Sequence, residues 1–275
     1  MVGAVLGSSR MSKGKKAAAQ ALVEFLTPLL GAAIEQRGRV VLGIGTGSTM
    51  AHVMDALHRA RQHHHWQPHQ LIGIPTSYQS QQLILSAGML MGSLAQFPRI
   101  DFAIDGADEI DASGRFIIKG GGGALFMEKL VASAAEQFII IADESKYNDM
   151  EGRLGVAWKG GIPLAVYPDA EHLVGKRIAQ QRPTLYHIQT RVYQGGKIGP
   201  VISDQGHLLM DLHLVDDTAF SDNLTHFVHI DRLAAMLDST PGIIAHGLFI
   251  DMASMIILGN NDTGTTRTIK PTQNQ

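Results

Sequence analysis

The sequence has no cysteine, and only 17% of its 275 residues are charged. Without cysteine the chain has no disulfides, no thiolate metal site and no cysteine nucleophile, which suits a reducing cytoplasm, where we expect the protein. The 23 basic and 25 acidic side chains leave a net charge of −2. No basic field therefore favours nucleic acid or a membrane surface.

Long apolar runs are also missing. None reaches about eighteen uninterrupted residues, so we expect no membrane-spanning helix. The first ten residues, MVGAVLGSSR, lack a basic segment and a long apolar core, which argues against a signal peptide. We expect these ten residues to form a loose extension.

What the chain does have is apolar residues and glycine. Hydrophobic residues make up 45% of it and glycine fills 30 positions, which is typical of a compact globular protein with many tight turns. At about 150 residues per domain, the length corresponds to a little under two domains.

The first half of the chain alternates helical patterns with short apolar runs. Met50, Val53, Met54 and Leu57 share one face of a helix that follows the run 40–44. Strands separated by helices indicate βαβ units and a mainly parallel sheet with both faces covered. We expect strands at 40–44, 71–74, 101–104, 116–118 and 138–142, and helices at 17–34, from about 48, at 79–86 and at 124–137.

The rhythm changes after about residue 150. The expected order is strand, helix, two strands, helix, strand, which is the split βαβ of a ferredoxin-like unit. Its elements are 163–167, 170–181, 188–193, 207–213, 231–237 and 242–245. The fold class is therefore α/β, with a Rossmann-like domain (1–152 and 239–275) and a smaller ferredoxin-like α+β domain (153–238).

A glycine-rich loop, GIGTGST at 43–49, joins the first strand to its helix. Glycine allows close approach of the backbone, and the amides at a helix start favour an anion. The dinucleotide pattern fails because Ser48 takes the place of its third glycine, and no lysine completes a Walker pattern. We interpret the loop as a site for a small phosphate; a plain glycine turn with a helix cap is the alternative.

The segment DGADE at 105–109 directly follows another expected strand. The carboxyl ends of parallel strands form the ligand crevice of α/β sheets. Asp105 and Asp108 can both face one small ligand there. The alternatives are a solvated acidic turn or a divalent metal site, for which carboxylates without a nearby histidine are a weak signal.

A third loop, KGGGG at 119–123, again lies between a strand and a helix. Four glycines cost much conformational entropy, so a chain keeps them where side chains would obstruct something. In the next helix, Glu128 shares a stripe with small apolar residues, where partial desolvation raises a carboxyl pKa and suits it to proton transfer. We expect the neighbouring Lys129 to face solvent. An ordinary surface glutamate is the alternative.

Other polar clusters carry less information. Lys146 follows the strand at 138–142 and is placed to reach the same ligand, although an exposed lysine is as common. The segment 75–79 is expected to cap a helix with hydroxyl groups. His63, His64, His65 and His69 lack matching carboxylates, so we expect no metal site there.

Together these motifs resemble a known family. GIGTGSTMAHVMDAL, IPTSYQS, DFAIDGADEID, IKGGGGALFMEKLVASAAEQFIIIADESK, PLAVYP and PGIIAHGLF are similar to the successive motifs of ribose-5-phosphate isomerase type A. The motifs occur in that family's order and extend over residues 13–259. The resemblance implies interconversion of ribose 5-phosphate and ribulose 5-phosphate, no metal, no organic cofactor, and a homodimer or tetramer.

The resemblance also assigns residues. Glu128 matches the family's general base, and Lys119, Asp105 and Asp108 match the polar groups around the reacting carbons. The remaining substrate-binding positions are expected at Thr46, Gly47, Ser48, Thr49, Gly106, Ala107, Gly120, Gly121, Gly122 and Lys146. Lys15 aligns with a lysine near the phosphate.

Two segments, 26–39 and 216–229, are longer than in the family's pattern. Two other functions stay open at this point. An amino-sugar phosphate isomerase or deaminase pairs a phosphate loop with carboxylates too, although the KGGGG loop with Glu128 argues against it. A sugar-phosphate sensor would need a basic DNA-binding region, and the cluster Lys13, Lys15 and Lys16 is too small for one.

The weak metal signal at Asp105 and Asp108 gives a first prediction. EDTA treatment leaves isomerase activity intact, because the acid–base chemistry needs only side chains. A coupled assay with ribose 5-phosphate measures the rate before and after chelation. Loss of activity that Mg²⁺ restores would contradict the metal-free interpretation.

Overall fold

A computed structural model of the chain describes residues 13–181, 186–193, 195, 198–214, 220–221 and 229–271. The expected loose extension at 1–10, and all but three residues of the enlarged segment 216–229, lie outside these ranges. The other enlarged segment, 26–39, continues the first helix to its end at Arg37.

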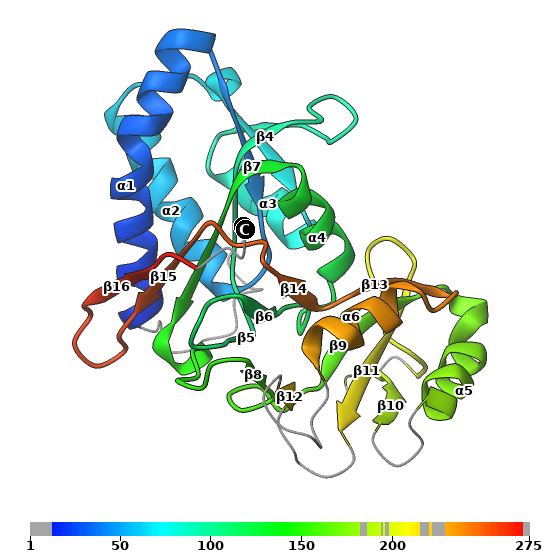
Figure 1. The fold of residues 1–275 in the computed structure, drawn as a ribbon. Helices are drawn as coiled ribbons and strands as arrows, with labels where there is room; N and C mark the ends of the chain where they lie inside the picture. Colours follow the sequence, from blue (N-terminus) through cyan, green and yellow to red (C-terminus); the bar gives the residue numbers. More distant parts are fainter. Residues whose placement is uncertain are drawn as a thin grey trace.

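A seven-stranded sheet forms the larger part of the molecule (Figure 1). Its order is β16-β15-β7-β4-β1-β2-β3, and all neighbours pair in parallel except β15 with β16. The mainly parallel sheet predicted from the sequence is confirmed. The strands are β1 Val40–Ile44, β2 Leu71–Pro75, β3 Leu90–Met91, β4 Ile100–Asp105, β7 Ala135–Asp143, β15 Met255–Gly259 and β16 Thr266–Ile269.

Both faces of this sheet are covered. On one face, Leu42 of β1 packs in a core that includes Leu26 of α1 and Met54 of α2. On the other, Val41 packs with Val131 of α4 and Ile117 of β6. Because alternate residues serve opposite cores, the central strands read as continuous apolar runs. The helices are α1 Lys13–Arg37, α2 Ser48–His63, α3 Tyr78–Ser86 and α4 Leu125–Ser133.

The helix α1 is long and apolar enough to cross a membrane by length and composition alone, with a mean hydropathy of 1.5 over eighteen residues. Core helices of globular proteins meet the same criterion. Here Leu22, Leu26 and Leu30 are fully buried in the core shared with α2. The expectation that no segment spans a membrane stays a prediction.

Two smaller sheets lie beside the main one. The strands β5 Glu109–Ile110, β6 Phe116–Ile118 and β14 Leu248–Ile250 form an antiparallel three-stranded sheet. The strand predicted at 116–118 therefore exists but leaves the main sheet. β8 Arg153–Leu154 pairs with β12 Phe220–Ser221.

The second unit has the predicted split βαβ order. β9 Ile162–Val166, β10 Tyr186–Thr190, β11 Leu208–Leu214 and β13 Ile243–His246 form a sheet in the order β10-β11-β9-β13. α5 Glu171–Gln181 and α6 Ile230–Asp238 pack on one face of this sheet. β13 lies after the expected domain boundary at residue 238 and nevertheless pairs with β9. This four-stranded sheet, called the small sheet below, therefore contains strands from before and after that boundary. The domain limits themselves stay a prediction.

One expected helix is too long. The helix predicted at 124–137 ends at Ser133, and β7 begins at Ala135, which pairs with Ile100 of β4. Ala135 is therefore not on the helical stripe of Glu128. Pairing with β4 overrides the helix propensity of residues 135–137, because Ile100 lies opposite Ala135 and its amide donates to the Ala134 carbonyl at 3.0 Å.

The contact between the start of α1 and the end of β15 generates a stability prediction. A Cβ atom at Gly259 would lie 1.9 Å from the carbonyl oxygen of Gly14, a backbone atom that cannot rotate away. We therefore expect Gly259→Ala to lower the free energy of unfolding by about 1–3 kcal/mol. At Gly31, where the nearest atom to a new Cβ would be 3.8 Å away, Gly31→Ala serves as the control. It is expected to be neutral or stabilising; equal urea midpoints for the two variants would contradict the steric account.

Candidate active site

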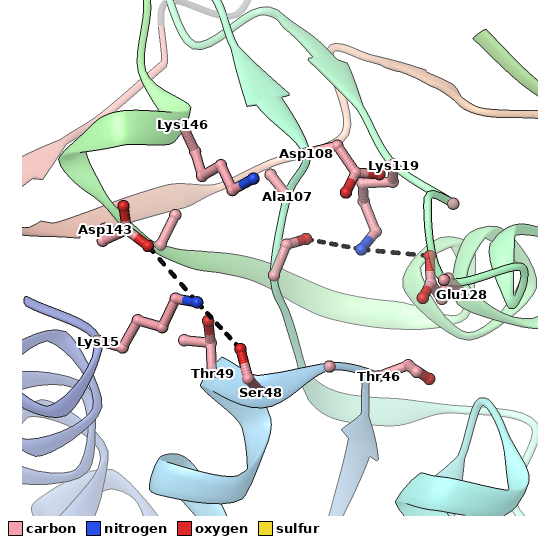
Figure 2. A pocket seen from close by; sticks show the side chains of 15 residues that line it. Lys15, Thr46, Ser48, Thr49, Ala107, Asp108, Lys119, Glu128, Asp143 and Lys146 are labelled. Atoms are coloured by element: carbon pink, nitrogen blue, oxygen red, sulfur yellow. Dashed lines mark hydrogen bonds and ion pairs between the residues drawn. The ribbon is translucent and has the colours of Figure 1, made fainter. Parts of the chain in front are cut away.

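A cavity of about 200 Å³ opens where β1, β4 and β7 end (Figure 2). This volume is below the roughly 300–1,000 Å³ typical of drug-sized ligands and suits a smaller molecule. The carboxyl ends of parallel strands are the usual ligand position in such sheets. Its walls are formed by Lys15, Thr46, Gly47, Ser48, Thr49, Gly106, Ala107, Asp108, Lys119, Gly120, Gly122, Glu128, Ala142, Asp143 and Lys146.

At one side of the cavity, a buried lysine lies between two carboxylates. Lys119 Nζ is 2.9 Å from Asp105 Oδ2. It is also 3.3 Å from Glu128 Oε2 and donates to the Gly106 carbonyl at 2.6 Å (Figure 2). The three charged side chains are at most 5% exposed. Lys119 directly follows β6, and Glu128 lies in the first turn of α4. The ends of β4 and β6 and the first turn of α4 thus bring the predicted catalytic groups together.

Burial decides the protonation of this cluster. Desolvation, together with the nearby charge of Asp105, raises the pKa of Glu128 to about 8. Burial also raises the pKa of Asp105, against the opposing charge of Lys119. Burial alone would lower the pKa of Lys119, but the Asp105 and Glu128 carboxylates outweigh it and raise that pKa. One ammonium thus faces two carboxylates, and Glu128 is the group that holds the extra proton near neutral pH.

Asp105 lies behind the cavity wall rather than in it. Its Oδ1 accepts hydrogen bonds from the amides of Thr46 at 3.1 Å and Gly106 at 2.7 Å. A Cβ atom at Gly45 would lie 2.0 Å from the Asp105 carboxyl, so glycine is required there. Asp105 therefore acts on the cavity through Lys119 and the loop that follows β1.

Asp108 and the glycine loop form the next part of the wall. Asp108 Oδ2 accepts a hydrogen bond from the Gly121 amide at 2.7 Å. The Gly123 amide closes a turn on the Gly120 carbonyl at 2.9 Å, and Gly120 has a φ of +97°, which favours glycine. Gly121, predicted to bind substrate, is beside the wall with its amide held by Asp108.

The opposite side of the cavity is cationic. Lys15 Nζ, from α1, donates to Ser48 Oγ at 3.0 Å at the start of α2, and Lys146 approaches from the turn after β7 (Figure 2). Gly47, with a φ of +113°, precedes the helix. Two ammonium groups, two hydroxyls (Ser48 and Thr49) and a helix start are typical of a phosphate site.

Two wall residues were missed in the sequence. Asp143 Oδ2 is 3.7 Å from Lys15 Nζ, and Ala142 precedes it at the end of β7. Burial would raise the pKa of Asp143, but hydrogen bonds from Ser145 and the charge of Lys15 hold it below its usual value. Its place as the last residue of a strand was the available signal, since Asp105 ends β4 in the same way.

The expectation for Lys129 is wrong. Its ammonium donates to the Leu248 carbonyl at 2.9 Å and lies 5.1 Å above the Phe249 ring, instead of facing solvent. The side of α4 that carries Lys129 is covered by β14, to which Leu248 and Phe249 belong. Burial lowers the pKa of Lys129 to about 8.

The histidine-rich loop shows aromatic packing: His64 stacks on Trp66 with ring centroids 4.9 Å apart. Within the described ranges, no group of three or more histidine or carboxylate side chains is placed to hold a metal ion.

The fold and the site together are typical of an α/β enzyme that holds a small phosphorylated substrate and moves protons on it. A family model described as ribose 5-phosphate isomerase A (phosphoriboisomerase A) matches residues 72–263. The chain belongs to the ribose 5-phosphate isomerase A family.

Individual relatives agree with this assignment. The ribose-5-phosphate isomerases of Sus scrofa and Homo sapiens are each 36% identical over 264 residues, which is 96% of this chain and 76% and 75% of theirs. A solved D-ribose-5-phosphate isomerase in complex with phospho-erythronic acid is 30% identical with a TM-score of 0.75, covering 93% of this chain and 97% of that one. The Methanocaldococcus jannaschii enzyme is 28% identical with a TM-score of 0.70, covering 90% and 99%.

The protonation of Glu128 generates a pH prediction. A base must be ionised, so kcat/KM, which reports the free enzyme, rises about tenfold per pH unit below pH 8 and levels off above it. In Asp105→Asn the inflection moves to lower pH, because a negative charge that raises the pKa of Glu128 is gone. Initial rates between pH 5.5 and about 9.5 measure both effects. The control Asp101→Asn, at the other end of β4, keeps the wild-type inflection; an inflection common to all three proteins would contradict the assignment.

Proposed function

We propose that Glu128 carries the proton in the interconversion of D-ribose 5-phosphate and D-ribulose 5-phosphate, the aldose–ketose isomerisation of the pentose phosphate pathway that membership of this family gives the chain. The observation that carries the proposal is Glu128 Oε2. This atom is buried at the cavity and accepts no hydrogen bond from any described residue, although Lys119 Nζ is 3.3 Å away. In its ionised form, this oxygen is placed to accept a proton from a substrate in the cavity.

The reaction needs one base on one face of the sugar. In the open-chain aldose, the Glu128 carboxylate takes the proton from C2, which leaves an enediolate, and then returns it to C1. A base whose pKa is near the working pH both accepts and releases a proton readily, and contributes about 10²–10⁴-fold to the rate. The Glu128 pKa of about 8 meets this requirement.

The negative charge of the enediolate needs donors. The Lys119 ammonium lies beside Glu128, and Gly120 and Gly122 of the glycine loop line the same cavity. A positioned donor of this kind is worth about 2.7–4 kcal/mol in the transition state. Asp108, whose carboxylate lies at the wall, is placed to move protons among the hydroxyls and, with Asp105 behind Lys119, to assist ring opening.

Binding of the phosphate group positions the sugar relative to Glu128. We place it between Lys15, Ser48, Thr49 and Lys146, across the cavity from Glu128. Binding at a non-reacting end orients C1 and C2 and lowers the entropy cost of the reaction. A relative is bound to phospho-erythronic acid. We infer that this acid also binds here, with its carboxylate in the place of the planar, charged enediolate.

The cytoplasmic location and the homo-oligomeric state, a dimer or tetramer, stay predictions. So does the absence of a cofactor requirement.

The role of Glu128 gives a direct prediction. Glu128→Gln abolishes isomerisation, with kcat lower by at least about 10²-fold, because the amide has no basic oxygen for the proton. Ribose 5-phosphate still binds, since its phosphate partners are unchanged; calorimetry measures this affinity and a coupled assay measures the rate. The exposed Glu136→Gln is the matched control and keeps full activity.

Near-normal turnover in Glu128→Gln would contradict the base assignment. A panel of pentose and hexose phosphates, assayed with the wild-type protein, separates this activity from that of an amino-sugar phosphate enzyme. We expect ribose 5-phosphate to be the preferred substrate.

A further inference from the structure

An arginine of the small unit reaches the catalytic glycine loop. Arg191, directly after β10, donates from Nη1 to the Gly121 carbonyl at 3.0 Å, and this atom is 3.4 Å from the Gly120 carbonyl. Its Nε donates to Asp211 Oδ2 at 2.9 Å, and its Nη2 bonds the other carboxylate oxygen. The side chain is 19% exposed. A bidentate carboxylate partner fixes the plane of the guanidinium and therefore the direction of Nη1.

This contact sets the direction of the next amide. In a trans peptide the C=O and the following N–H point in opposite directions. The Gly121 carbonyl points to Arg191, outside the cavity, so the Gly122 N–H points the other way, and Gly122 is a residue of the cavity wall. No residue in the described part of the chain accepts a hydrogen bond from that amide.

Gly121 itself is held at both its amide and its carbonyl group. The Gly121 amide donates to Asp108 at 2.7 Å, while the Gly121 carbonyl is bound to Arg191. Together, Asp108 and Arg191 fix the orientation of the peptide groups on either side of Gly121. Among the described residues, the turn bond from Gly123 to Gly120 is the contact that would remain to oppose rotation of the peptide between Gly121 and Gly122 without Arg191. Glycines make such a rotation inexpensive.

We propose that Arg191, held by Asp211, is a positioning residue that aims the Gly122 N–H at the oxygen of the enediolate. The proposal rests on the proposed isomerase function. The guanidinium charge next to the Gly121 carbonyl also polarises the shared peptide and makes the Gly122 N–H a stronger donor. The small unit thereby contributes to catalysis without touching the substrate.

The test is Arg191→Met, which keeps the length of the side chain and removes its donors. We expect kcat to fall about 10- to 100-fold, less than the roughly 10²–10³-fold for complete removal of such a donor, with KM little changed. Phospho-erythronic acid loses affinity as a competitive inhibitor, because its carboxylate needs the amide. Inorganic phosphate inhibits as in the wild type, and the pH inflection of kcat/KM stays in place.

The matched control is Arg115→Met. Arg115 also pairs with carboxylates, those of Asp231 and Asp251, and its side chain is 21% exposed. It precedes β6, whereas the glycine loop follows that strand. A variant that only loses an ion pair keeps its kcat. If Arg191→Met keeps wild-type kcat, or loses affinity for inorganic phosphate in step with kcat, the proposal is overturned.

Asp211→Asn is the second variant, in case Arg191→Met does not fold. It leaves the guanidinium in place but weakens its fixed orientation, so we expect the same pattern with a smaller fall in kcat. An unchanged kcat in Asp211→Asn, with no measurable loss of phospho-erythronic acid affinity, overturns the proposal. Failure of the wild-type protein to isomerise ribose 5-phosphate would instead reject the proposed function.

Discussion

The structure depends on one buried ammonium that has to satisfy two carboxylates. A buried site cannot hold two full negative charges beside a single positive one without cost, so one carboxyl group keeps a proton into the neutral range. Asp105 receives two backbone amides as well as Lys119. Glu128 receives fewer donors, and burial raises its pKa to about 8. An acid–base residue matched to neutral pH is therefore a consequence of burial and of an uneven supply of hydrogen bonds.

The packing of α4 explains how Glu128 is held in this place. Val131 and Ala132 pack against the seven-stranded sheet, while Leu125 joins a separate cluster with Ala165 and Leu209 of the small sheet. The short helix is thus clamped between two sheets (Figure 1). Lys129 fixes a further side by its bond to the Leu248 carbonyl. A rotation of α4 that removed Glu128 from the cavity would have to break all of these contacts.

Much of the fold follows from local patterns. The apolar run at Val40–Ile44 and the helical face of Met50 and Leu57 appear as expected, because their periodicity reflects burial directly. The predicted end of α4 was wrong because the alanine-rich segment after Ser133 is compatible with a helix or a strand. Its pairing with β4 makes it a strand. The predicted exposure of Lys129 was wrong because β14, a strand more than a hundred residues later, covers this side chain.

The site shows the same division. Ser48 and Lys146, which follow β1 and β7, could be predicted because a parallel sheet gathers its carboxyl ends at one edge. Lys119 reaches the same cavity from the end of β6, a strand of the antiparallel sheet. The position of Asp105 behind the cavity wall could not be predicted. It depends on Gly45, 60 residues earlier, which leaves room for the Asp105 carboxyl. Arg191 gave no sequence signal at all: its role depends on a bond to a glycine carbonyl about seventy residues away.

The central claim is that burial beside Asp105 and Lys119, and not contact with substrate, sets the proton affinity of Glu128. Its most direct test is a titration of the ligand-free protein labelled with ¹³C at the glutamate side-chain carboxyls, followed by NMR, with Glu128→Gln to identify the resonance. The account predicts that this resonance titrates near pH 8. A midpoint near 4.5, the ordinary value for a glutamate, would contradict it.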